Sequence, residues 1–204
     1  MQPQPRSDNV QGVLQLAQRA GVIRPRDLAH AGIDPAYLRR LYRAGQFERV
    51  GRGLYVPVGW QPTEHAQIAQ AAKRVPRGVL CLLSALRFHE LGTQQPYAVW
   101  LAIGVKDRRP RETGLPLQIV RFSGAAYSEG VEEHELEGVP VRVYGLAKTI
   151  ADCFKYRNKI GLDVALEALR DGWRRRRVTM DELWRYARAC RMTNVMRPYL
   201  ESLT

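Results

Sequence analysis

Three arginines, Arg39, Arg40 and Arg43, lie in a segment whose apolar spacing predicts a helix. Leu38 and Leu41 fall on a different face of that helix, so the arginines are expected to face solvent. A guanidinium group donates paired hydrogen bonds to phosphate and to the edge of guanine. The pattern therefore predicts contact with double-stranded DNA, and the alternative is an ordinary solvated helix face.

A glycine-rich turn follows this helix and carries two more arginines. Residues 47–50 and 54–56 have the composition of two short strands around a Gly-Arg-Gly turn. Arg49 lies on the first strand and Arg52 at the turn. Glycines beside Arg52 would let the backbone approach a phosphate closely, although a hairpin that needs positive φ would also require them. Both arginines are therefore candidates for contact with DNA.

Two further residues complete the predicted DNA-binding set. Tyr37 lies near the start of the predicted helix, where base contacts cluster, and packing is the alternative role for it. Arg26 is a candidate phosphate contact in the preceding segment. The full set is Arg26, Tyr37, Arg39, Arg40, Arg43, Arg49 and Arg52.

The elements that must position these residues fit within the first sixty residues. Residues 10–20 and 24–31 have helical apolar spacing, and residues 1–7 read as a frayed tail. Asp34 can cap the third helix, and Gly45 stops it. Three helices followed by a hairpin predict a winged helix-turn-helix, with the third helix in the major groove. We therefore assign residues 1–60 to a DNA-binding domain.

Composition agrees with a polyanion as the partner. The 204 residues carry a formal net charge of +12, and 27 arginines stand against five lysines. A charge of this size favours binding to nucleic acid, although a solvated basic surface or a genomic base bias would produce it as well. With 45% hydrophobic residues, the chain can also bury a core.

No pattern in the sequence indicates a metal, a cofactor or a membrane segment. Cys81, Cys153 and Cys190 are widely spaced among apolar neighbours, which favours reduced, buried thiols. The histidines are scattered too, without the spacing of zinc ligands. The N-terminus lacks the apolar run of a signal peptide, and no segment reaches the roughly twenty apolar residues of a membrane helix. We expect a cytoplasmic protein without catalytic residues, metal or cofactor.

The remaining residues, 61–204, predict a second domain in which a small sheet is combined with several helices. Helices are expected at 63–75, 82–91, 146–156, 162–169, 179–189 and 195–203, and strands at 97–103, 117–122, 132–136 and 139–144, with a strand or turn at 78–80. The fold class is α+β, because the elements do not alternate as they would in a parallel α/β sheet.

Two basic runs in this domain admit two interpretations. The densest is Arg174, Arg175, Arg176 and Arg177, which is expected to link two helices, and the other spans residues 106–111. Each is either a solvated loop or a second contact with nucleic acid or a partner protein.

Three stretches of the chain carry further motifs. Residues 41–56 contain Leu-Tyr-Arg-Ala-Gly and Arg-Val-Gly-Arg-Gly-Leu-Tyr, residues 84–91 read Ser-Ala-Leu-Arg-Phe-His-Glu-Leu, and residues 143–152 place a Thr and an Asp three apart. In order and spacing these resemble the AbiEi family, antitoxins of type IV toxin–antitoxin systems. Members of that family usually carry Gly at the position of Glu90.

The resemblance implies a winged module that binds operator repeats and represses its own operon. Cooperative or dimeric binding to these repeats is compatible with this role. It also implies a C-terminal antitoxin domain in residues 61–204 that counteracts a nucleotidyltransferase-like toxin, in a system of the phage-defence type. Direct contact between antitoxin and toxin is not required in such systems.

Enzymatic interpretations find little support in the residues. Ser84 and His89 are five apart on a predicted helix and point in different directions, so we interpret them as structural. Thr149 and Asp152 are expected to brace a helix start. A restriction-type nuclease needs a carboxylate two residues before a lysine to hold Mg²⁺, and none of the five lysines has one.

A transcriptional regulator with a ligand-sensing second domain is the other alternative. Trp100, Phe122 and Tyr144 could line a pocket in the predicted sheet, and they could equally form its core.

Overall fold

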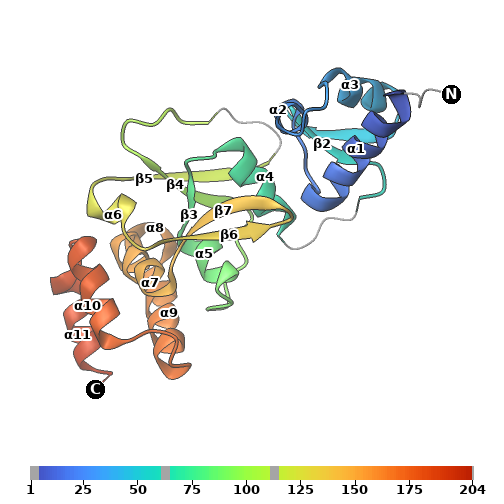
Figure 1. Cartoon of the computed structure of the whole chain (residues 1–204). Coiled ribbons are helices and arrows are strands. Elements are labelled where there is room, and N and C mark those ends of the chain that lie inside the picture. The colour runs from blue at the N-terminus through green and yellow to red at the C-terminus, as the bar shows by residue number, and fades with distance from the viewer. Residues whose placement is uncertain (1–4, 61–64, 111–114, 204) are drawn as a thin grey trace. The chain divides into compact units, whose positions relative to one another are not determined.

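The computed structural model describes residues 5–60, 65–110 and 115–203, which divide into two compact units (Figure 1). The first unit contains residues 5–60, 65–74, 115 and 135–140, and the second contains residues 75–110, 116–134 and 141–203. The first unit therefore includes helix α4 (Ala66–Arg74), which lies beyond the expected boundary at residue 60.

Three helices and a hairpin begin the first unit, in the expected order. They are α1 (Pro5–Ala20), α2 (Pro25–His30), α3 (Ala36–Arg43), β1 (Phe47–Gly51) and β2 (Leu54–Pro57). The expectation of a frayed tail is wrong for residues 5–7, because α1 begins at Pro5, and proline is well suited to the first turn of a helix. Residues 1–4 lie outside the described part of the chain.

Apolar side chains of all three helices and of β1 form the core of this unit. Val13, Leu28, Leu38 and Phe47 are each at most 2% exposed. Glycines at positive φ end α3 and shape the hairpin turn, as expected: Gly45 has φ +69° and Gly53 has φ +71°. Burial of one helical face thus leaves the other faces of α3 in solvent.

A mixed five-stranded sheet forms the centre of the second unit. Its strands are β3 (Val79–Leu80), β4 (Val99–Gly104), β5 (Leu117–Phe122), β6 (Val131–Leu136) and β7 (Val139–Tyr144), in the order β5-β4-β3-β7-β6. β4 is parallel to β5, β3 is antiparallel to β4, and β3 is parallel to β7. The short β3 thereby joins the two halves of the sheet, and the fold is α+β.

The second unit also contains seven helices within the described residues, and most of them were expected. They are α5 (Leu82–Phe88), α6 (Ala125–Ser128), α7 (Leu146–Lys155), α8 (Arg157–Ile160), α9 (Leu162–Arg174), α10 (Met180–Ala189) and α11 (Thr193–Glu201). Helices α5, α9 and α10 contact α7, and α11 lies against α10 (Figure 1). The four-residue helices α6 and α8 were not predicted from the sequence. The helix expected from residue 63 is α4, which begins at Ala66, and residues 63–64 lie outside the described part.

Several other boundaries differ from the expected ones, most by one or two residues, such as α11, which was expected at 195–203. β4 begins at Val99 instead of residue 97, and Tyr97 is 78% exposed. α5 ends at Phe88 because Glu90 adopts a left-handed conformation, with φ +54°. α9 continues to Arg174, beyond the expected end at residue 169.

The core of the second unit is apolar and contains three thiols. Cys81, Cys153 and Cys190 are free and fully buried. Burial raises the pKa of the Cys190 thiol to about 12 and also raises the pKa values of the other two cysteines. All three are therefore neutral packing residues, as the sequence predicts.

Candidate nucleic-acid interface

Helix α3 presents its three arginines to solvent. Arg39, Arg40 and Arg43 are exposed, whereas Leu38 and Leu41 on the opposite face are at most 6% exposed. The two apolar side chains fix how α3 lies on the core, so the position of the guanidinium groups follows from packing.

Tyr37 and Arg40 form a stacked pair on α3. The Arg40 guanidinium carbon lies 5.1 Å from the centroid of the Tyr37 ring, and the ring itself packs against the core of the first unit. A stacked guanidinium loses less conformational entropy on binding than a free one. Tyr37 therefore has the packing role that the sequence analysis gave as its alternative, and it orients Arg40 at the same time.

The β1–β2 hairpin carries the other two predicted arginines. Arg52 is exposed at the turn, and the exposed Arg49 donates from Nε to the carbonyl of Gly51 at 3.1 Å. The hairpin is tied to α3 through Tyr42 and Tyr55, whose rings meet edge to face with centroids 5.5 Å apart. Helix and hairpin thus form one rigid surface with arginines on both elements.

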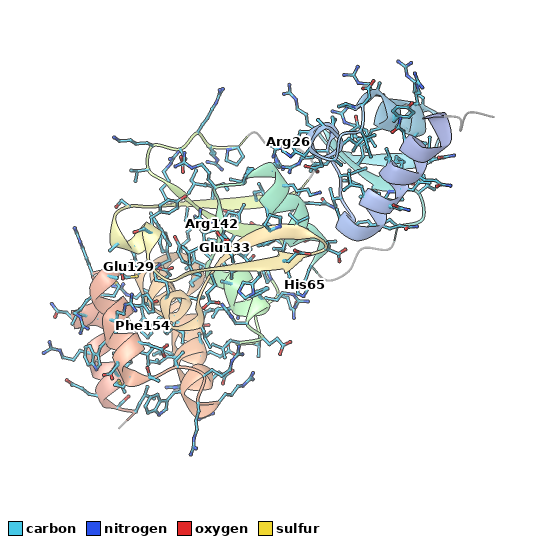
Figure 2. The ribbon with its side chains drawn as sticks, viewed as in Figure 1. Arg26, His65, Glu129, Glu133, Arg142 and Phe154 are labelled. Carbon is cyan, nitrogen blue, oxygen red and sulfur yellow. The ribbon has the colours of Figure 1, made fainter. Side chains whose placement is uncertain are left out.

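Arg26 lies on α2, away from this pairing of helix and hairpin, and is labelled in Figure 2. Its side chain is exposed, with Nη2 3.4 Å from the carbonyl of Lys73. Its neighbour Arg24 has a different role, because its Nη2 pairs with Asp27 at 2.8 Å. The structure therefore leaves Arg26 accessible and engages Arg24 internally.

A small, partly buried ion network accompanies Arg24 at the start of α2. Lys73 Nζ lies 3.1 Å from Asp27 Oδ2 and donates to the carbonyl of Val22. Burial alone would raise the pKa of Asp27, but the hydrogen bond from Arg24 and the charge of Lys73 outweigh it and lower that pKa. The network attaches α4 to α2 within the first unit.

The four-arginine run after α9 separates into two pairs. Arg174 and Arg176 are exposed, and no hydrogen bond or ion pair joins either side chain to another described residue. Arg175 Nη1 donates to the carbonyl of Glu90 at 2.8 Å, and Arg177 Nη1 donates to the carbonyl of His89. Half of the run therefore caps the C-terminal end of α5 and is part of the structure of the second unit.

The motif residues of the second and third stretches have structural partners. Ser84 Oγ accepts a hydrogen bond from the backbone N–H of Trp100 at 3.0 Å. His89 Nε2 lies 2.8 Å from the carbonyl oxygen of Tyr144, and Thr149 Oγ1 donates to that same oxygen at 3.0 Å. Ser84 and His89 thus bind different partners, which agrees with their interpretation as structural residues.

A fully buried ion pair was missed by the sequence analysis. Lys148 Nζ lies 2.6 Å from Asp152 Oδ2, and both side chains are 0% exposed. The ammonium group also lies 3.9 Å from the centroid of the Tyr144 ring, and Cys190 Sγ lies 3.2 Å from Asp152 Oδ1. The i, i+4 spacing of Lys148 and Asp152 was visible in the sequence, but such pairs usually lie on solvated helix faces.

The aromatic residues considered for a ligand pocket belong to the core. Trp100, Phe122 and Tyr144 are at most 7% exposed, and the rings of Phe122 and Tyr144 stack with centroids 5.7 Å apart. Within the described ranges, no three His, Cys, Asp or Glu side chains are placed to hold a metal ion. In the same ranges, no helix combines the length and apolarity needed to cross a membrane.

Comparison with known families gave a match to one segment of the chain, and α3 and the β1–β2 hairpin lie within that segment. No curated protein matches the chain in sequence. Residues 12–58 match a family model described as "Transcriptional regulator, AbiEi antitoxin". This segment runs from α1 to the end of the hairpin and includes every predicted DNA-binding residue. This segment is therefore similar to the AbiEi antitoxin transcriptional regulators that the model describes.

Proposed function

We propose that this protein is a DNA-binding transcriptional regulator that represses its own operon and acts as the antitoxin of a type IV toxin–antitoxin system. The carrying observation is the surface of α3, where Arg39, Arg40 and Arg43 are exposed within the segment that matches the regulator family. The surface suits the major groove, because a helix backed by a packed core can enter it with its basic face outward.

In this proposal, α3 reads base edges and the hairpin binds the backbone as a wing. Arg40, held by Tyr37, is the best-oriented candidate for a guanine contact. Arg52 at the turn and Arg26 on α2 would bind phosphates. Residues 1–60 would be the DNA-binding domain, and residues 61–204 would supply the antitoxin function. The regulator would act in the cytoplasm on operator repeats, with a nucleotidyltransferase-like toxin as its functional partner.

Titration of promoter DNA tests the regulator part. The wild-type protein should bind a duplex of its own promoter more tightly than a scrambled duplex, measured by fluorescence anisotropy at fixed salt. Arg40→Ala should weaken promoter binding by roughly 1–3 kcal/mol, or about 5–150-fold, and reduce the preference for the promoter. Arg52→Ala should weaken both duplexes alike.

Arg188→Ala provides the matched control, because Arg188 is exposed on α10, outside the matched segment. It removes the same charge and should leave affinity nearly unchanged. Equal affinity of the wild-type protein for promoter and scrambled duplex would refute operator recognition.

The antitoxin part has its own test. Co-expression with the product of the neighbouring gene should restore growth that this product alone arrests, and a chain that lacks antitoxin function would leave growth arrested. The variant Arg40→Ala should still restore growth, because this proposal assigns Arg40 to DNA recognition.

A further inference from the structure

One end of the sheet in the second unit collects basic side chains from several elements. β4 and β5 finish at this end, because Gly104 pairs with Phe122, and β3 begins there, because it is antiparallel to β4. Arg142 of β7 lies close by, because its Nη1 donates to the carbonyl of Arg77. The basic residues at this end are Arg77 before β3, Lys106, Arg108 and Arg109 after β4, Arg121 on β5 and Arg142 on β7.

The loop after β4 is held in place by hydrogen bonds. Arg121 Nη1 donates to the carbonyls of Gly104, Val105 and Asp107, at 2.9, 2.8 and 2.9 Å. Asp107 Oδ2 accepts from the N–H of Gly104 at 2.8 Å, and its Oδ1 lies 3.3 Å from Arg77 Nη1. One guanidinium and one carboxylate thus hold the turn at residues 104–107, and Arg108 and Arg109 follow this turn directly.

Three of the other side chains are cationic, and none of the three has a partner among the described residues. Lys106, Arg108 and Arg109 are exposed, and no described residue forms a hydrogen bond or ion pair with any of them. The carboxylate of Asp107 is committed to Arg77 and to the backbone, so it does not neutralise them. An ordinary solvated loop would not be expected to have its backbone held by the hydrogen bonds from Arg121 and Asp107.

The neighbouring residues extend the basic surface on one side and limit it on the other. The carbonyl of Arg77 accepts hydrogen bonds from Tyr127 and from Arg142, at 2.8 and 3.2 Å. Figure 2 labels Arg142 on β7 together with Glu133 on β6, the neighbouring strand. The acidic Glu133 on β6 therefore limits the basic region on this side.

We propose that this end of the sheet, with Lys106, Arg108 and Arg109 at its centre, is a second binding surface for the phosphate backbone of duplex DNA. Lys106 lies in the braced turn and Arg108 and Arg109 directly follow it, so three cations without a partner among the described residues are close together and available to phosphate. A protein-binding site would usually centre on aromatic or apolar side chains. Among the described residues of this loop, Val105 is the one large apolar side chain that is exposed.

This inference does not require operator specificity, because phosphate contacts carry no sequence information. Its signature is the dependence of affinity on salt. Each phosphate contact contributes about 0.9 to the slope of log K against log salt concentration. The combined variant Lys106→Ala/Arg108→Ala/Arg109→Ala should therefore lower that slope by up to about 3, equally for promoter and scrambled duplexes.

The matched control is Arg170→Ala/Arg188→Ala/Arg197→Ala. It removes the same charge from three exposed positions on α9, α10 and α11. We expect its slope to change by less than about 1. Arg121→Gln is a second variant, which keeps the three loop cations and removes the guanidinium that braces their turn, and it should give an intermediate slope.

The outcomes distinguish this proposal from the proposed function. An unchanged slope in the loop variant, or an equal loss in the control variant, overturns the second surface even if the promoter is recognised. A wild-type protein that binds promoter and scrambled duplex equally, with a lower slope in the loop variant, supports the second surface and refutes operator recognition. Binding of an acidic protein by the loop, with an unchanged DNA slope, would also overturn the proposal. Absence of any duplex binding overturns both proposals.

Discussion

The side chains of His89 and Thr149 meet at one oxygen atom, the carbonyl of Tyr144. A carbonyl can only accept, so His89 donates its Nε2–H and Thr149 its hydroxyl hydrogen. Tyr144 is the last residue of β7, and Thr149 lies on α7, which begins two residues later. The two donors therefore fix the junction of strand and helix, and they connect it to the C-terminal end of α5.

This junction should make stability depend on pH. Burial is the main reason that the pKa of His89 lies below its ordinary value of 6.5. Because the unfolded chain then binds a proton more readily than the folded one, stability is fully present above the unfolded pKa and falls as the pH drops below it. We expect the free energy of unfolding to decrease between about pH 7.5 and about pH 5.5, by at most about 1.4 kcal/mol per pH unit from this group.

His89→Gln provides the comparison, because its amide can donate to the same carbonyl and does not titrate. Urea unfolding at several pH values should give a shallower pH dependence for this variant than for the wild-type protein. Parallel profiles for the two proteins would exclude His89 as the titrating group.

The buried pair Lys148–Asp152 should be costly to break from one side only. Burial raises the pKa of Asp152, although Lys148 acts against it, so the carboxylate depends on its partner to remain charged. Lys148→Met and Asp152→Asn should each destabilise the protein by about 3–5 kcal/mol, because each leaves one buried charge uncompensated. The double variant should lose less than the sum of the two. Denaturant unfolding of all four proteins measures this coupling, and additive losses would show that the pair does not interact.

Glu90 is a position where glycine should stabilise the protein. Its φ of +54° lies in the region that favours glycine over residues with a Cβ atom. Glu90→Gly should gain up to about 1 kcal/mol, and the midpoint of thermal unfolding should rise by about 2–4 °C. Glu90→Ala retains a Cβ atom and should show no such gain. Equal behaviour of the Gly and Ala variants would mean that the side-chain chemistry, and not φ, determines stability at this position.

The division of the arginine run predicts two classes of variant. Arg175→Ala and Arg177→Ala should each lower the free energy of unfolding by about 0.5–1.5 kcal/mol, because each removes a hydrogen bond to a carbonyl at the end of α5. Arg174→Ala and Arg176→Ala change only exposed charge and should lie within about 0.5 kcal/mol of wild type. A uniform small effect at all four positions would contradict this division.

Local sequence patterns predicted much of the fold. Leu38 and Leu41 defined the buried face of α3, and the glycines around Arg52 defined the hairpin, because helical spacing and turn chemistry are local properties. β5 and β7 have the expected bounds, and Thr179 and Glu182 form the expected capping box at the start of α10. The assignment of Arg39, Arg40 and Arg43 to an exposed face followed from the same spacing.

Features that depend on distant partners could not be predicted. Arg175 donates to a carbonyl 85 residues earlier, and nothing within a run of four arginines distinguishes it from Arg174. The left-handed φ of Glu90 could not be predicted from the residue type, because glycine is the residue that usually adopts such φ values. The burial of Lys148 depends on packing of α10 against α7, which brings Cys190 to Asp152. The strand order β5-β4-β3-β7-β6 is likewise set by long-range pairing.

The positions of the three cysteines allow the opening of the second unit to be measured by thiol labelling. Cys81, Cys153 and Cys190 all lie in the second unit, each with no accessible surface, and the first unit contains no cysteine. A thiol reagent can therefore react only when the second unit opens, and its rate of labelling measures that opening without interference from the first unit.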